Sequence, residues 1–156
     1  MLNRITDGIT GIRTGLHVCR GNWSRREDVL LTGDYHALLP AFAAMHVDQL
    51  VLEYATPRAG ELRVVGEALG RGAAAGVGKE LGLGCVNPRT DRAEDPAGIV
   101  ARAEEALAFF PPERIWLNPD CGFGCFASRC VNEEEVAVAK LRSMVAAART
   151  LRERHG

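Results

Sequence analysis

Residues 49–53 read Gln-Leu-Val-Leu-Glu, a short apolar run that ends on a carboxylate. Such runs, when turn-forming residues flank them, are typical of buried β-strands. Three further runs of the same kind lie at 14–18, 81–86 and 114–118, so the four runs begin at intervals of roughly 33 residues. The sequence therefore predicts four β-strands at nearly regular spacing.

Helix start signals lie between the predicted strands. Asp95 followed by Pro96 suits a helix start, because Asp caps the first turn and Pro fits the first helical position; the helix leads into 99–110. Asn132, with Glu135 three residues later, resembles a capping box and predicts an amphipathic helix that reaches about Arg154. The segment 66–84 is rich in glycine and alanine, which predicts a loop or a poorly packed helix.

Alternating strands and helices favour parallel βα units over hairpins. An eight-fold barrel uses about 250 residues, or about 31 for each unit, so 156 residues hold half of one. We therefore expect an α/β fold in which residues 1–156 form one domain, about half of a TIM (β/α)8 barrel. A small open four-stranded α/β sheet is the alternative. A half-barrel has two open edges. We therefore expect either that its strands close against a second copy, or that the chain is a fragment or a split subunit of a larger barrel.

The composition excludes several classes of partner. A formal net charge of −1 gives no general attraction to nucleic acid or anionic lipid. Residues 1–5 lack the apolar core of a signal peptide, and no stretch approaches the roughly 18 apolar residues of a membrane helix. We expect a cytoplasmic protein without nucleic-acid or membrane partners. Five cysteines, an odd number, favour reduced thiols that are available to a metal.

Four potential metal ligands lie at the predicted strand ends. His17 and Cys19 are two residues apart, so they face the same way from the first strand. Glu53 ends the second strand and Cys121 follows the fourth, and the C-terminal ends of barrel strands open onto one mouth. One imidazole, two thiolates and a carboxylate suit Zn²⁺. The sequence predicts a zinc site at His17, Cys19, Glu53 and Cys121.

Alternative roles exist for each cysteine and histidine. A lone cysteine is most often a small buried hydrophobe, and a lone histidine is most often hydrogen-bonded. The spacing of Cys121, Cys125 and Cys130 matches neither a zinc ribbon nor a ferredoxin. Cys85 lies inside a predicted strand and is expected in the core, and Cys125 and Cys130 receive no role.

Four motifs together resemble the C-terminal catalytic barrel of the cobalamin-independent methionine synthase family, from about residue 12 to Arg152. They are His-Val-Cys-Arg-Gly-Asn at 17–22, Leu-Glu-Tyr-Ala at 52–55, Val-Asn-Pro-Arg at 86–89 and Trp-Leu-Asn-Pro-Asp-Cys-Gly at 116–122. The resemblance places the family's zinc ligands on the same four residues. It implies an enzyme like 5-methyltetrahydropteroyltriglutamate–homocysteine S-methyltransferase, in which zinc holds homocysteine as a thiolate that takes a methyl group from methylfolate.

Two departures from the family pattern bear on this implied activity. Asn87 stands where the family has a histidine that protonates the folate, and asparagine cannot transfer a proton at neutral pH. Arg89 is a candidate partner for a substrate carboxylate, and Asp120 is a candidate substrate contact. We expect this sequence to cover only the second half of the barrel, so complete catalysis is expected to need another half-barrel. The alternatives are a thiol alkyltransferase of the coenzyme M type and a truncated half-barrel that only binds zinc.

Overall fold

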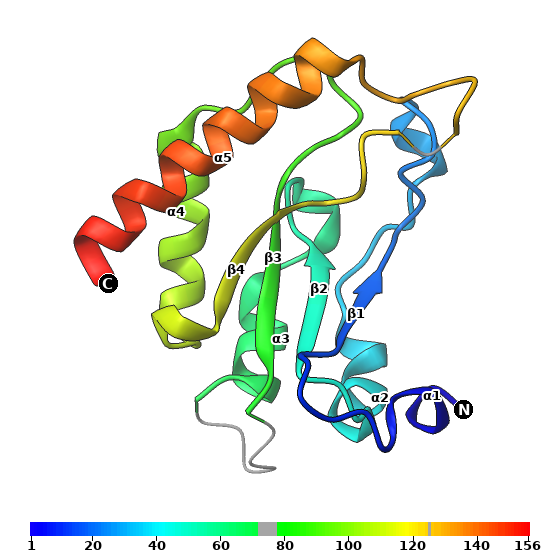
Figure 1. The fold of residues 1–156 in the computed structure, drawn as a ribbon, viewed down its shortest axis with the longest axis vertical. Helices are drawn as coiled ribbons and strands as arrows, with labels where there is room; N and C mark the ends of the chain where they lie inside the picture. Colours follow the sequence, from blue (N-terminus) through cyan, green and yellow to red (C-terminus); the bar gives the residue numbers. More distant parts are fainter. Residues whose placement is uncertain (72–77, 125) are drawn as a thin grey trace.

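The computed structural model describes residues 1–71, 78–124 and 126–156. Within these ranges four strands form one parallel sheet in chain order (Figure 1): β1 (Gly15–Val18), β2 (Gln49–Glu53), β3 (Glu80–Val86) and β4 (Ile115–Pro119). All four predicted strands are confirmed, with boundaries that differ by no more than about one residue.

Helices alternate with the strands. The α-helices are α1 (Asn3–Thr6), α2 (Leu39–Ala44), α3 (Leu62–Leu69), α4 (Pro96–Leu107) and α5 (Glu134–His155), and 3-10 turns occur at Glu27–Val29, His36–Leu38, Pro57–Ala59 and Pro112–Arg114. Neighbouring parallel strands joined through helices have the connectivity of half a (β/α)8 barrel, which confirms the predicted fold class. None of the described helices has the length and apolar character needed to cross a membrane.

One face of the sheet packs against helices and forms the main core. Leu52 of β2 and Leu83 of β3 are almost fully buried, and they share a cluster with Val65 of α3 and Ala106 of α4. Side chains alternate between the two faces of a strand, so the residues next to Leu52 in β2 and next to Leu83 in β3 point to the opposite face. In a barrel, that opposite face is the interior.

Two glycines of β3 let side chains from its neighbours meet on this second face. A Cβ added to Gly82 would lie 2.5 Å from Asn118 Nδ2 and 2.9 Å from Val51 Cγ2. A Cβ added to Gly84 would lie 2.3 Å from Asp120 Oδ1. The missing side chains of β3 therefore make room for side chains from β2 and from the end of β4.

The Arg13 side chain lies across this second face, near the start of the strands. Its Nε lies 2.9 Å from Glu80 Oε1, and its guanidinium lies 4.9 Å from the centre of the Trp116 ring. A side chain that begins before β1 thus reaches a residue of β4. Because β1 and β4 are the two outer strands, this contact spans the full width of the sheet.

The predicted helix starts have different outcomes. Asp95 caps α4 as expected, since its Oδ1 accepts a hydrogen bond from Ala97 N at 3.0 Å. The capping box at Asn132 is wrong: Glu133 is the residue before α5, and Asn132 Nδ2 donates to Thr90 O at 3.0 Å instead. The contact between two loops outcompetes the local cap.

The glycine- and alanine-rich segment begins inside a helix. α3 covers its first residues, and α2 was not anticipated as a helix. Residues 72–77 of the segment lie outside the described residues.

Candidate metal centre

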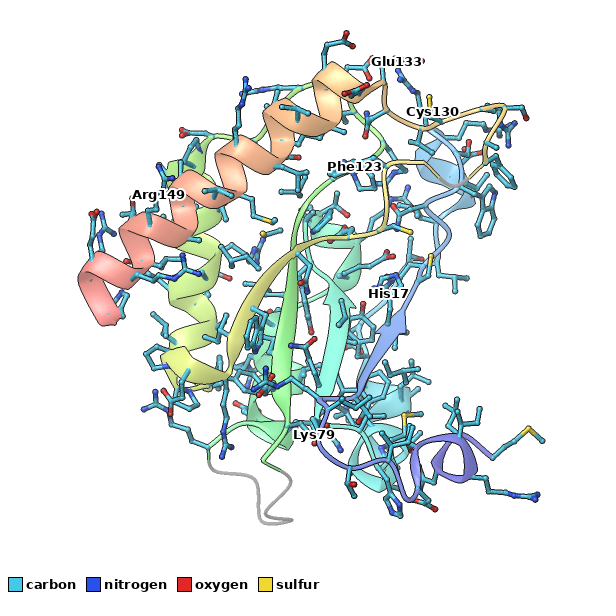
Figure 2. The ribbon with its side chains drawn as sticks, viewed as in Figure 1. His17, Lys79, Phe123, Cys130, Glu133 and Arg149 are labelled. Carbon is cyan, nitrogen blue, oxygen red and sulfur yellow. The ribbon has the colours of Figure 1, made fainter. Side chains whose placement is uncertain are left out.

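A histidine and two cysteines meet at the C-terminal end of the sheet. His17 belongs to β1, Cys19 follows that strand directly, and Cys121 follows β4. One ligand atom from each residue lies within 4.8 Å of the other two. Figure 2 shows His17 on β1, on the side of the sheet where the strands end. The His17 and Cys19 side chains are exposed and Cys121 is partly buried, so the group is open to solvent.

The three ligands come from the two outermost strands. Strands lie about 4.8 Å apart in a sheet, so a flat arrangement would separate β1 from β4 by roughly 14 Å. The ligand atoms of Cys19 and Cys121 are nevertheless within 4.8 Å. Cys19 and Cys121 both follow their strands, so the two loops direct the thiols toward each other.

Glu53 lies beside this group. Its carboxylate is 2% exposed, and its Oε1 lies 3.8 Å from His17 Nε2 and accepts a hydrogen bond from Arg20 N at 3.1 Å. It does not belong to the group of described ligand atoms that all lie within 4.8 Å of one another. The structure thus places the fourth predicted ligand next to His17, held by a backbone amide.

Tyr35 fixes the backbone at Glu53. The Tyr35 hydroxyl accepts a hydrogen bond from Glu53 N at 2.9 Å and donates to Glu53 O at 3.3 Å. Burial raises the pKa of Tyr35 well above its ordinary value, so the phenol stays protonated and can donate. The end of β2 is therefore rigidly held where its carboxylate approaches His17.

Asp120 joins the end of β4 to the end of β2. Its Oδ1 accepts hydrogen bonds from Tyr54 N and Ala55 N, both at 3.0 Å. Burial raises the pKa of this carboxyl group to about 7, and the neighbouring Glu53 acts in the same direction. The predicted substrate contact is thus 3% exposed and bound to backbone amides.

Asn87 and Arg89 contact their own and neighbouring loops. Asn87 Oδ1 accepts a hydrogen bond from Arg89 N at 3.0 Å, which stabilises the turn after β3. Arg89 is only 3% exposed, and its Nη1 donates to Asn22 Oδ1 in the loop after β1. In this arrangement both residues organise the loops around the candidate centre, and a direct role on a substrate stays a prediction.

The remaining cysteines lie outside the group. Cys85 is buried in the core as predicted, and burial raises its pKa to about 12. Cys130 is exposed in the loop before α5, where its Sγ lies 3.5 Å from Glu133 Oε1 (Figure 2). Cys125 lies outside the described residues.

Sequence reasoning assigned no role to several polar residues that hold the loops at this end of the sheet. The buried Lys140 carried a signal, because a lysine stood among the small and apolar residues of a predicted amphipathic helix. Arg25 and Asp91 carried none, because an exposed arginine and an exposed aspartate are ordinary surface residues.

Parallel βα units with an imidazole and two thiols at their C-terminal ends define the class of protein: a barrel-type α/β domain with a candidate thiolate-rich metal centre.

The comparisons with known proteins identify the family. The profile described as "Cobalamin-independent synthase, Catalytic domain" matches residues 12–150, and the chain belongs to this family. It is 31% identical over 151 residues to the methionine synthase of Pyrococcus abyssi, which covers 97% of this chain and 37% of the relative. It is 32% identical over 123 residues to a 5-methyltetrahydropteroyltriglutamate–homocysteine methyltransferase of Acidithiobacillus ferrooxidans, covering 79% of this chain and 14% of the relative.

A solved structure has the same fold. The B12-independent methionine synthase from Shewanella sp. W3-18-1, in complex with selenomethionine, superimposes with a TM-score of 0.78 at 19% identity. The match covers 98% of this chain and 42% of that structure. The chain thus spans well under half the length of the relatives it matches.

Proposed function

We propose that this chain forms the zinc-binding part of a thiol methyltransferase. The observation that carries the proposal is the approach of His17, Cys19 and Cys121 to within 4.8 Å of one another in a member of this family. An imidazole and two thiolates are ligands that zinc prefers. Glu53, 3.8 Å from His17, is the fourth proposed ligand.

The chemistry of the donor set fits a thiol substrate. A free alkyl thiol has a pKa near 8.5 and is only a few per cent thiolate at neutral pH, whereas a zinc-bound thiol is deprotonated outright. Two protein thiolates and one carboxylate make the centre electron-rich, which preserves the nucleophilic character of a bound sulfur. The relatives' names point to homocysteine as the acceptor and a methylated folate as the donor.

Glu53 is the proposed ligand that a substrate thiol would most readily replace. A carboxylate is the hardest donor among the four, so it yields to a soft sulfur more readily than the cysteines do. Arg20 N donates a hydrogen bond to Glu53 Oε1, and this bond would hold the carboxylate whether or not it coordinated a metal. This arrangement would allow homocysteine to bind without leaving a buried charge unpartnered.

The complete reaction requires more of the barrel. Within the described residues, β1 and β4 each pair with a strand on one side only. We infer that further barrel strands, from the same or another polypeptide, close these edges and supply the remaining substrate contacts. We also propose a reducing compartment, such as the cytoplasm, because Cys19 and Cys121 must remain free thiols.

One observation favours a second candidate, a thiol alkyltransferase with a different donor, such as an enzyme of the coenzyme M type. Asn87 cannot protonate a leaving folate nitrogen at neutral pH, and its amide oxygen is already bound to Arg89 N. A donor whose leaving group needs no proton would be compatible with this asparagine.

A methyl-transfer assay tests the proposal. The chain is incubated with zinc, homocysteine and 5-methyltetrahydropteroyltriglutamate, alone and fused to the first half of a family barrel. We expect methionine from the fusion, its loss in Cys121→Ser, and its retention in Cys130→Ser, since Cys130 does not belong to the group of described ligand atoms around His17. A fusion that binds zinc but alkylates only other thiols would support the second candidate instead. Activity that survives Cys121→Ser would contradict both.

A further inference from the structure

The loop between β3 and α4, residues 87–95, holds none of the candidate ligands but contacts both loops that carry them. One ligand loop follows β1 and carries Cys19, and the other follows β4 and carries Cys121. These two strands lie at opposite edges of the sheet. The middle loop is therefore in a position to fix the distance between the two thiols.

Arg25 connects the loop after β1 to the middle loop. Its Nη1 lies 2.6 Å from Asp91 Oδ2, and its Nη2 lies 2.8 Å from Asp91 Oδ1. Two parallel charge-assisted hydrogen bonds fix both distance and orientation. Although both side chains are about half exposed, this geometry makes the pair more specific than a single-contact surface ion pair.

The same guanidinium also reaches the loop after β4. Arg25 Nε and Nη2 donate to Val131 O at 3.1 and 2.8 Å. Next to Val131, Asn132 Nδ2 donates to Thr90 O at 3.0 Å and to Asp91 Oδ1 at 3.3 Å. Arg25 thus joins all three loops, and we call Arg25, Asp91, Val131 and Asn132 the Arg25 bridge.

Lys140 of α5 fixes the middle loop to the body of the fold. Its side chain is fully buried, and its Nζ donates to Asn87 O at 2.9 Å and to Arg92 O at 2.6 Å. Glu94 balances its charge at 3.3 Å. The Arg25 bridge is therefore attached to a rigid support and not to a free loop.

We propose that Arg25 is a positioning residue that sets the separation of Cys19 and Cys121 and thereby the affinity of the centre for zinc. For the metal, this inference rests on the proposed function. Without the bridge, the two ligand loops would have to lose more conformational entropy on binding. Residues that orient metal ligands from outside typically change metal affinity by 10- to 100-fold when they are removed.

Replacement of Arg25 would change the zinc affinity in opposite directions, depending on whether Arg25 acts through its charge or by positioning the ligand loops. A cation near the mouth repels Zn²⁺, so removal of its charge alone would strengthen metal binding. Loss of the bridge would weaken binding. The sign of the change therefore distinguishes the two roles.

The test compares Arg25→Met with Arg26→Met by competition for zinc with a chelator. Arg26 is the matched control because it is exposed and pairs with Asp28 of its own loop, so it loses the same charge without a contact between loops. We expect roughly 10-fold weaker zinc binding for Arg25→Met and unchanged or tighter binding for Arg26→Met. Zinc binding by Arg25→Met that equals or exceeds that of the wild type would overturn the proposal.

A second arm requires no metal. The equilibrium between free thiols and a Cys19–Cys121 disulfide is measured in a glutathione buffer, with the bond located by peptide mass mapping. We expect this disulfide to form several-fold less readily in Arg25→Met than in wild type or Arg26→Met, because the loops lose their fixed separation. An equal equilibrium in all three proteins would contradict the proposal. A wild type that binds no zinc but shows the disulfide difference would refute the proposed metal function and leave the positioning role intact.

Discussion

Asp120 illustrates how one residue serves the centre without being a ligand. Its carboxylate satisfies two backbone amides at the end of β2 and lies against Gly84 of β3. It thereby joins three strand ends immediately before Cys121. A sequence motif placed Asp120 near the site, but only the fold shows that its partners are backbone groups.

Two substitutions of Asp120 distinguish the loss of its hydrogen-bond acceptor from the loss of its charge. We expect Asp120→Ala to lower the free energy of unfolding by about 2 kcal/mol, since Ala55 N loses its acceptor and Tyr54 N keeps only its bond to Gly84 O. Asp120→Asn retains an acceptor oxygen and should cost clearly less. Urea unfolding of the metal-free proteins measures both, and equal losses in the two variants would contradict the assignment.

Single residues also show what the sequence could and could not predict about the site. The alternation of side chains along a strand correctly placed His17 and Cys19 on one side, and the parallel topology brought Cys121 to them. The position of Glu53 just outside the group depends on its hydrogen bond with Arg20 N, which no local pattern encodes. Asn132 followed a capping pattern, yet its partner is 42 residues away in sequence.

At the scale of elements, strand β3 is adapted to let its neighbours' side chains meet. We expect Gly84→Ala to destabilise the fold by roughly 2 kcal/mol, because the new methyl group would overlap Asp120 Oδ1 and Leu52 O. Gly98 of α4 has open space around it, so Gly98→Ala should stabilise by up to about 1 kcal/mol. Thermal unfolding of both variants checks the contrast, and a tolerated Gly84→Ala would show that the sheet can relax.

Helix α5 supplies the support for the middle loop through one lysine. We predict that Lys140→Met lowers the free energy of unfolding by about 3–5 kcal/mol, since Glu94 and two carbonyl groups lose their cation inside the protein. Arg142→Met, on the exposed surface of the same helix, should change it by less than about 0.5 kcal/mol. Denaturant titrations compare them, and similar effects would rule out a supporting role for Lys140.

The elements differ in how well the sequence predicted them. The four strands are short apolar runs, which give a strong signal, and all four were predicted. The helices α2 and α3 are short and lack side-chain caps, so their start signals are weak. Contacts with the sheet decide their conformation more than local propensity does.

At the scale of the whole molecule, the sheet edges explain the exposed apolar surface. A groove of about 570 Å³ beside β4 is lined by residues that include Trp116, Val145 and Leu151. Trp116 and Val145 are 42% and 47% exposed. In a closed barrel, the next βα unit would lie along this edge.

We therefore expect the 156-residue polypeptide to self-associate through its open edges. Sedimentation velocity should show species heavier than a monomer whose proportion rises with concentration. Val145→Lys should shift them toward the monomer, because a charge in an apolar contact is costly. Arg149→Lys on the same helix, labelled in Figure 2, is the control that should leave the distribution unchanged. A wild type that stays monomeric at all concentrations would contradict this expectation.

We propose that His17, Cys19 and Cys121, with Glu53 beside them, bind zinc. The most direct measurement is the metal content of the purified chain, together with the absorption spectrum after replacement of the metal by Co²⁺. We predict about one metal ion per chain and thiolate-to-cobalt charge-transfer bands. Cys19→Ser and Cys121→Ser should weaken those bands and release the metal, whereas Cys130→Ser should change neither. A folded wild-type chain that binds no metal, or metal binding that survives both ligand substitutions, would refute the claim.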